Sequence, residues 1–246
     1  MDESLLTAFA AVERSHWWFQ ARREIVLAVV ERAVPAGGAV LDIGCGTGFV
    51  LERLRERYDA WGLDVSATAV ALCRARGLEQ VALGSTDDPS AVQGRRFQAV
   101  LFLDVLEHLD DDAASLRRAR DLLLPGGAVI VTVPAFMFLW SHHDDLNEHR
   151  RRYDRPGVEA LLRRGGFRIE QVSYFNAYLF PVAAAARTAA RVLGSSGSGG
   201  LRVPPKPINA LLRRVFESEK GRVARPSPGR GFPFGISLLA VGRVES

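Results

Sequence analysis

A glycine-rich stretch is the part of the sequence whose residue types and spacing most clearly favour ligand binding. Residues 40–48 read Val-Leu-Asp-Ile-Gly-Cys-Gly-Thr-Gly, in which Cys45 lies among three alternating glycines, Gly44, Gly46 and Gly48. Glycines at this spacing let the backbone turn tightly and approach a ligand closely. A helix that begins just after them would present free N–H groups to an anionic group. The spacing is not that of a dinucleotide site, because Phe49 stands where a third glycine would be required.

Two acidic residues flank this glycine loop in a pattern typical of a nucleoside site. Asp42 lies two residues before Gly44, and Asp64 lies 20 residues after it, at the end of the next predicted strand. A carboxylate in that place accepts hydrogen bonds from both hydroxyls of a ribose. Asp42 would either hold the loop or meet an amino group of the ligand. The alternative, a tight turn beside a solvated aspartate, explains the glycines but not the two acids at strand ends.

A second group of polar residues follows a strand predicted at 128–133. The loop contains an aromatic run and then a cluster of titratable residues: His142, His143, Asp144 and His149. His143, oriented by Asp144, is a candidate general base for an oxygen or nitrogen nucleophile, and His149 is a further catalytic candidate. The alternative is a structural loop in which Asp144 and His149 pair with arginines. The spacing of these residues matches no diagnostic metal site, so we predict no bound metal.

The elements that must position these residues alternate between strands and helices. The apolar runs predict strands at 39–43, 60–65, 80–83, 97–103, 128–133, 167–174 and 235–244. Helices are predicted at 17–33, 49–58, 113–124, 157–164 and from an N-cap at Ser66 through Arg76. This alternation indicates an α/β fold whose mostly parallel sheet has helices on both faces. A helical insertion at 175–231 precedes the last strand and contains a Gly/Ser tract at 194–200, which predicts a flexible loop.

Taken together, these motifs resemble the class I S-adenosylmethionine-dependent methyltransferases. The resemblance rests on 40–48, on Asp64, on QAVLFLDVLEHL before residue 110, and on LLLPGG at 122–127. It implies a Rossmann-like seven-stranded sheet, closed by an antiparallel hairpin, and S-adenosylmethionine as the cofactor. The loop containing W-x-x-H-D and H-x-R-R-Y resembles a subgroup of these enzymes.

The resemblance also implies positions for the cofactor. The loop Gly44–Gly48, with Cys45 and Gly46, would approach the methionine part and Asp64 would meet the ribose, while Asp42, Val65 and Asp104 complete the predicted set. Many family members have an acidic residue after the third strand that contacts adenine; this chain has Gly84-Ser85-Thr86 there, so that either Ser85 or Asp87 would be the substitute. Arg23 would meet the cofactor carboxylate, unless its helix only docks on the sheet with its arginines reaching solvent. Glu107 and His108 would lie at the rim of the site, with no chemical role assigned.

Length and composition favour one domain of 246 residues with an ordinary apolar content of 48%. We predict a cap at 1–38, a cofactor-binding core at 39–174, a lid at 175–231 and a closing strand at 232–246. The two cysteines have neither a metal nor a disulfide spacing, and the sequence shows no leader pattern and no long apolar segment. We therefore expect a cytoplasmic protein. It would be a monomer or homodimer, whose amphipathic helices either contact a membrane surface, cover an apolar substrate pocket, or pack on the sheet or on a second subunit.

The net charge of +4 is distributed unevenly along the chain. Residues 1–149 carry −8 and residues 150–230 carry +12. We therefore expect a methyltransferase acting on a small-molecule or lipid-like acceptor, with an anionic acceptor favoured over a neutral one. A nucleic-acid methyltransferase that uses the basic half is the alternative enzyme, although no Asn-Pro-Pro-Tyr-like motif follows the fourth strand. A non-catalytic scaffold that binds the cofactor or a membrane surface is the other alternative.

Overall fold

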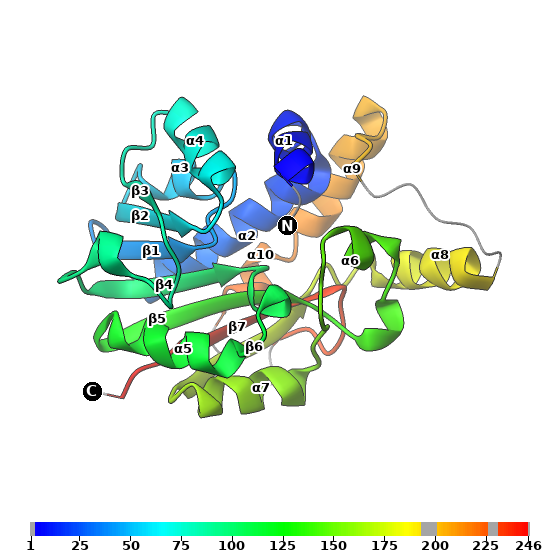
Figure 1. The fold of residues 1–246 in the computed structure, drawn as a ribbon. Helices are drawn as coiled ribbons and strands as arrows, with labels where there is room; N and C mark the ends of the chain where they lie inside the picture. The colour runs from blue at the N-terminus through cyan, green and yellow to red at the C-terminus, as the bar shows by residue number, and fades with distance from the viewer. Residues whose placement is uncertain (1–2, 193–200, 226–230, 246) are drawn as a thin grey trace.

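A computed structural model describes residues 3–192, 201–225 and 231–245 of the chain. Within these residues, seven strands form one sheet in the order β3-β2-β1-β4-β5-β7-β6 (Figure 1). β7 is antiparallel to both neighbours, and the other neighbouring pairs are parallel. The strands are β1 Ala39–Ile43, β2 Asp59–Asp64, β3 Val81–Leu83, β4 Phe97–Leu103, β5 Leu123–Pro134, β6 Arg168–Phe175 and β7 Ser237–Arg243. The predicted Rossmann-like, mostly parallel sheet is confirmed.

Helices cover both faces of the sheet (Figure 1). They are α1 Glu3–Val12, α2 Trp17–Ala33, α3 Leu51–Leu54, α4 Ala67–Ala75, α5 Asp112–Asp121, α6 His142–Leu146, α7 Arg155–Arg164, α8 Phe180–Val192, α9 Lys206–Glu217 and α10 Lys220–Val223. Short 3₁₀ turns are η1 Ser90–Val92, η2 Leu106–His108 and η3 Met137–Leu139. The predicted N-cap is confirmed, because the Ser66 hydroxyl accepts a hydrogen bond from the Ala69 N–H at 3.2 Å.

The helix predicted at 49–58 is much shorter in the structure. α3 covers only 51–54, and the chain then turns, with the N–H groups of Arg57 and Tyr58 both bonded to the Leu54 carbonyl. The turn is needed because β2 begins at Asp59, directly beside the start of β1. A further helix, α1, was not predicted and precedes α2.

The centre of the sheet forms the apolar core. β1, β4 and β5 are almost completely buried, as expected for parallel strands covered on both faces. α2 covers one face with Ile25, Val26, Val29 and Val30, all buried. β1 lies between β2 and β4, so the connections from its carboxyl end and from that of β4 run to opposite sides. Ligands of open α/β sheets bind at such a point, which is where the glycine loop lies.

The helices between β6 and β7 pack in two different parts of the structure. α8 extends beyond the carboxyl ends of the strands (Figure 1), where the Arg187 guanidinium donates to the Leu139 carbonyl of η3 at 2.7 Å. α9 instead packs beside α2, where the Asn209 side chain bonds to the Trp17 N–H and the Ser15 carbonyl. The tract at 194–200 lies outside the described residues. In the part of the chain described, no helix is both long enough and apolar enough to cross a membrane.

Candidate active site

The glycine loop follows β1 with its backbone in conformations that favour glycine. Gly44, Gly46 and Gly48 all have positive φ, between +55° and +76°. A Cβ on Gly48 would lie 2.6 Å from a methyl carbon of Leu78, so close packing also requires glycine there. A Cβ on Gly46 would have no heavy atom within 4 Å. The loop therefore packs tightly at its end and keeps an open side at Gly46, where a ligand can approach the backbone.

Asp64 and Asp42 lie on either side of this loop. The Asp64 carboxylate accepts hydrogen bonds from the Gly46 and Ser66 N–H groups at 2.8 and 2.9 Å. Asp42 is 2% exposed, and its Oδ1 has no hydrogen-bond partner among the described residues. Burial raises the pKa of Asp42 to about 7; Arg22 opposes the shift and Asp64 adds to it. A buried, incompletely bonded carboxylate beside an open glycine backbone fits a ligand that carries a cationic amino group.

A partly buried ion pair lies at the carboxyl end of β4. The Arg22 guanidinium lies 2.7 Å from a carboxylate oxygen of Asp104 and donates to the Thr132 hydroxyl at 3.0 Å. That hydroxyl donates to the other Asp104 oxygen at 3.0 Å. Asp104 has a φ of +60°, unusual for a residue other than glycine, so its position is held by these bonds. The network fixes the first residue after β4 beside the glycine loop.

Arg22 is the arginine of α2 in this network, whereas Arg23, which was predicted to meet the cofactor carboxylate, lies outside it. The Arg23 guanidinium lies over the Phe49 ring, 4.0 Å from its centroid. The sequence did contain a signal, because Arg22 continues the helical spacing of the buried Ile25 and Val26. Arg23, one residue on, lies outside that stripe.

The remaining predicted cofactor residues lie around the same loop. Val65 is 76% exposed directly after Asp64, which leaves an open apolar surface at the end of β2. The Ser85 hydroxyl accepts hydrogen bonds from the N–H groups of Asp87 and Asp88, within its own turn. The Cys45 thiol is buried, 3.9 Å from the Cys73 sulfur. Cys45 therefore contributes backbone rather than side chain to the open side of the loop.

Asp144 is the centre of a buried network after β5. Its carboxylate accepts two hydrogen bonds from the Arg152 guanidinium, at 2.7 and 2.9 Å, and lies 2.9 Å from His149 Nδ1. It also accepts a hydrogen bond from the Ser141 N–H at the start of α6. Burial acts to raise the pKa of Asp144, but the hydrogen bonds from His149 and Arg152 outweigh it and hold the pKa well below its usual range. Asp144 is therefore an ionised residue that fixes His149 and Arg152.

The partner of Asp144 differs from the predicted one. We expected Asp144 to orient His143, but His143 Nε2 lies 3.3 Å from the Asn147 amide nitrogen instead. Both histidine and aspartate are in α6, where consecutive side chains point in different directions. His149 comes from the following loop and can reach back to the carboxylate. Of the predicted catalytic residues, the structure joins Asp144 to His149 and leaves His143 in a separate contact.

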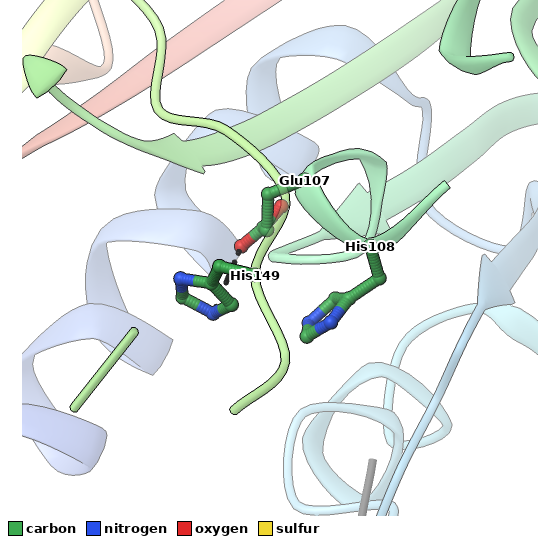
Figure 2. A group of neighbouring side chains, drawn as sticks. All are labelled: Glu107, His108 and His149. Atoms are coloured by element: carbon green, nitrogen blue, oxygen red, sulfur yellow. Dashed lines mark ion pairs between the residues drawn. The ribbon is translucent and has the colours of Figure 1, made fainter. Parts of the chain in front are cut away.

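His149 also belongs to a cluster that the sequence did not bring together. Glu107 and His108 of η2 lie next to His149 (Figure 2), and we call these three residues the Glu-His-His cluster. His149 Nε2 lies 3.9 Å from a Glu107 oxygen, and the two imidazole centroids are 4.9 Å apart. Burial, followed by the Asp104 carboxylate, raises the pKa of Glu107 well above its usual range. Burial, followed by His149, lowers the pKa of His108 to about 4, so this imidazole is neutral at pH 7.

An aromatic surface lies beside the loop after β5. Phe136 stacks on Phe138 with ring centroids 5.2 Å apart, and the Phe180 ring of α8 lies 6.0 Å from that of Phe136. Phe234, before β7, extends the surface through its contact with Phe180 at 5.4 Å. Phe138 is 57% exposed and Phe234 is 45% exposed. The structure thus gathers these rings into one partly exposed apolar surface, which we call the aromatic wall.

Comparison with known proteins shows which family has this fold and these motifs. A family model described as a methyltransferase domain matches residues 17–172, more than half of the chain. The chain belongs to the class I S-adenosylmethionine-dependent methyltransferases. It is 30% identical over 199 residues to the ubiquinone biosynthesis O-methyltransferase of Xylella fastidiosa, a match covering 70% of this chain and 80% of the relative. The corresponding protein of Xanthomonas axonopodis is 29% identical, and the match covers 83% of that protein.

Solved structures agree with this fold at lower identity. A methyltransferase in complex with the Trm112 activator of Haloferax volcanii has a TM-score of 0.61 and 18% identity, and the match covers 98% of both chains. An S-adenosylmethionine-dependent methyltransferase of Thermotoga maritima has a TM-score of 0.57 and 18% identity. That match covers 96% of this chain and 93% of the other. Membership of this family, shown by the family model and the relatives, makes the protein an enzyme that uses S-adenosylmethionine, which excludes the non-catalytic scaffold among the predicted alternatives.

Proposed function

We propose that this methyltransferase transfers the cofactor's methyl group to a hydroxyl oxygen of a small acceptor that carries an apolar portion. The observation that carries the proposal is the position of His149. Its Nδ1 is held by the buried Asp144, in the loop that follows β5 at the same edge of the sheet as the glycine loop. The relatives named as O-methyltransferases support an oxygen acceptor.

The donor would lie along the glycine loop. The open backbone at Gly46 would approach its methionine part, and Asp42 would meet the cationic amino group. Asp64 would exchange its backbone hydrogen bonds for the two ribose hydroxyls, with Val65 and Ser85 toward adenine. When bound, S-adenosylmethionine supplies a methyl group already activated by the sulfonium. The protein's contribution to transfer is then mainly the alignment of donor and acceptor.

The acceptor would lie between the aromatic wall and the Glu-His-His cluster. Phe138 and its neighbours provide an exposed apolar surface for the body of the acceptor. His149 Nε2, with Nδ1 fixed by Asp144, would face the reacting hydroxyl. Val105, which lies against Gly44 of the glycine loop, connects the donor side to the cluster residues at 107 and 108. The charge of +12 over residues 150–230 favours an acceptor that carries a carboxylate or phosphate.

The proposal is tested by following the methyl group. The full chain is incubated with methyl-labelled S-adenosylmethionine and four acceptors: an alkyl-tailed catechol carboxylate, the same compound without the tail, an alkylamine and an oligonucleotide. We expect a labelled methyl ether on the tailed catechol, a higher KM without the tail, and a higher KM for Phe138→Ala. Labelling of the amine nitrogen or of the oligonucleotide, with the catechols unlabelled, would refute it.

A further inference from the structure

We propose that Arg187 is the anion-binding residue of the acceptor site and that its guanidinium receives a carboxylate or phosphate group of the acceptor. Arg187 belongs to α8, which extends beyond the carboxyl ends of the strands (Figure 1). Its Nη1 donates to the Leu139 carbonyl of η3 at 2.7 Å. That the bound molecule is the methyl acceptor rests on the proposed function, whereas the binding of an oxyanion by Arg187 does not.

The charge of Arg187 is not compensated by an acidic residue of its own. It forms no ion pair with any residue that the structure describes, and the acid whose charge acts on it, Asp144, is already bonded to Arg152 and His149. Burial, followed by the charge of Arg152, lowers the pKa of Arg187 to about 10, and Asp144 opposes the shift. A partly dehydrated cation beside another cation is costly, and a bound oxyanion removes that cost.

The hydrogen bond to Leu139 leaves the rest of the guanidinium for a ligand. Among the described residues, neither Nε nor Nη2 of Arg187 has a hydrogen-bond acceptor, and neither nitrogen is fully enclosed by the protein. The Nε–H and one Nη2–H of a guanidinium point the same way, a pair that matches two oxygens of a carboxylate or phosphate. Because the bond at Nη1 holds the guanidinium against η3, this pair of donors is positioned before the ligand arrives.

Arg187 lies on the same two segments as the aromatic wall. Phe180 of the wall precedes Arg187 by two turns of α8, which places both residues on one side of the helix, about 10 Å apart along its axis. Phe138, whose ring centroid lies 6.5 Å from that of Phe180, directly precedes Leu139, the residue that binds Arg187. An acceptor with its apolar portion on these rings can therefore place an anionic group at Arg187.

The neighbouring cationic side chains are not free to bind the anion in place of Arg187. Arg152 donates to both oxygens of Asp144 and to the Ala135 carbonyl. Burial lowers the pKa of His143, and the charge of Arg187 adds to that shift, so this imidazole is mostly neutral at pH 7. A purely structural role for Arg187, holding α8 on η3, would explain the bond to the Leu139 carbonyl but not the uncompensated charge.

Binding of unreactive probes tests the site directly. The full chain, loaded with S-adenosylhomocysteine, is titrated by calorimetry with octylbenzoate, octylphenyl phosphate and the uncharged octylbenzamide. We expect at least one anion to bind about tenfold or more tightly than the amide, and this preference to fall below about threefold in Arg187→Gln. Arg214→Gln is the matched control, because Arg214 is an exposed arginine of α9 and its replacement removes the same charge. The two anions distinguish a carboxylate acceptor from a phosphate acceptor.

The preference for anion over amide separates anion binding from a packing role. Loss of packing alone would weaken octylbenzoate and octylbenzamide together and leave their ratio unchanged, which would overturn the site. The site is also overturned if neither anion binds wild type more tightly than the amide does. Arg187→Lys, which keeps the charge but loses the paired donors, should retain part of the preference, and circular dichroism confirms that each variant is folded.

Turnover separates the failure of this site from the failure of the proposed function. With the tailed catechol carboxylate, Arg187→Gln should raise KM about tenfold and leave kcat within about twofold, while KM for the matching carboxamide stays unchanged. If Arg187 confers the anion preference but neither catechol is methylated, the proposed function fails and the site stands. If both catechols are methylated with the same KM in wild type and in Arg187→Gln, the site fails and the proposed function stands.

Discussion

Replacement of Asp144 by asparagine should destabilise the protein strongly, because it leaves the Arg152 charge buried without a counter-ion. Asp144 is completely buried, and the Arg152 side chain is 2% exposed. Asparagine keeps the shape but loses the charge, and its amide group would place N–H donors against the guanidinium. Breaking a buried ion pair from one side costs about 3–5 kcal/mol. For a protein of this size, that corresponds to a decrease of roughly 6–20 °C in Tm.

The pH dependence of the free energy of unfolding should also reveal the contribution of the Asp144–Arg152 pair. Hydrogen bonds hold the folded pKa of Asp144 well below its ordinary value of 3.8, despite burial. Its contribution is therefore complete above the unfolded pKa and is lost as the pH falls through the folded one. The difference between wild type and Asp144→Asn should be constant from pH 5 to 7 and should shrink below pH 4.

Urea unfolding followed by circular dichroism measures the effect, with Asp145→Asn as the matched control. Asp145 is the exposed neighbour, whose bond to the Trp140 indole an asparagine oxygen can keep, so its variant should remain within about 0.5 kcal/mol of wild type. Adding Arg152→Met to Asp144→Asn should recover at least about 1 kcal/mol over additivity, because it removes the stranded charge. A loss below about 1 kcal/mol in Asp144→Asn alone would refute this account of the buried pair.

Three further predictions concern the glycine loop. Asp64→Ala should weaken S-adenosylhomocysteine binding about 10- to 100-fold by calorimetry, since charged hydrogen bonds contribute about 1.5–3 kcal/mol; an unchanged Kd would contradict the ribose assignment. The pKa of Asp42 is raised from its ordinary value of 3.8 to about 7 in the folded protein. The stability that Asp42 contributes is therefore fully present below pH 3.8 and is lost as the pH rises toward 7. Without cofactor, wild type should lose stability relative to Asp42→Asn by roughly 1.4 kcal/mol per pH unit over that window, and parallel urea profiles would disprove the shift. Gly46→Ala and Gly94→Ala have similar backbone strain, with φ of +55° and +80° and open space around both, but only Gly46→Ala should lose cofactor affinity.

The order of the elements could be predicted because the strands at the centre of the sheet are mostly apolar runs separated by helical patterns. β1 and β4 have the predicted bounds, and α2 begins and ends at the predicted residues. The short α3 could not be predicted, because the length of a helix between two parallel strands is set by where the next strand must begin. The two destinations of the insertion were also not predictable, since an amphipathic pattern indicates that a helix has an apolar face but not what it packs against.

The site was predictable where local sequence determines its geometry. The glycines and Asp64 are positioned by the end of a strand and by a backbone turn, and both features are visible in the sequence. The Glu-His-His cluster was not predictable, because Glu107 and His149 are far apart in the chain and meet only when the loop after β5 folds back onto η2. The pairing of Asp144 with His149 was missed for a related reason, since it depends on how α6 ends.

Three buried acidic residues lie near the carboxyl ends of the strands, and they differ in whether the protein itself satisfies their hydrogen bonds. Asp144 is fully bonded within the protein, so its role is to position His149 and Arg152. Asp42 and Glu107 are equally buried but have oxygens without hydrogen-bond partners in the described chain. Buried acids without partners are costly, so a protein that keeps two of them at one edge is built for ligands that supply the missing interactions. The amino group of the donor would complete Asp42, so S-adenosylhomocysteine should raise Tm.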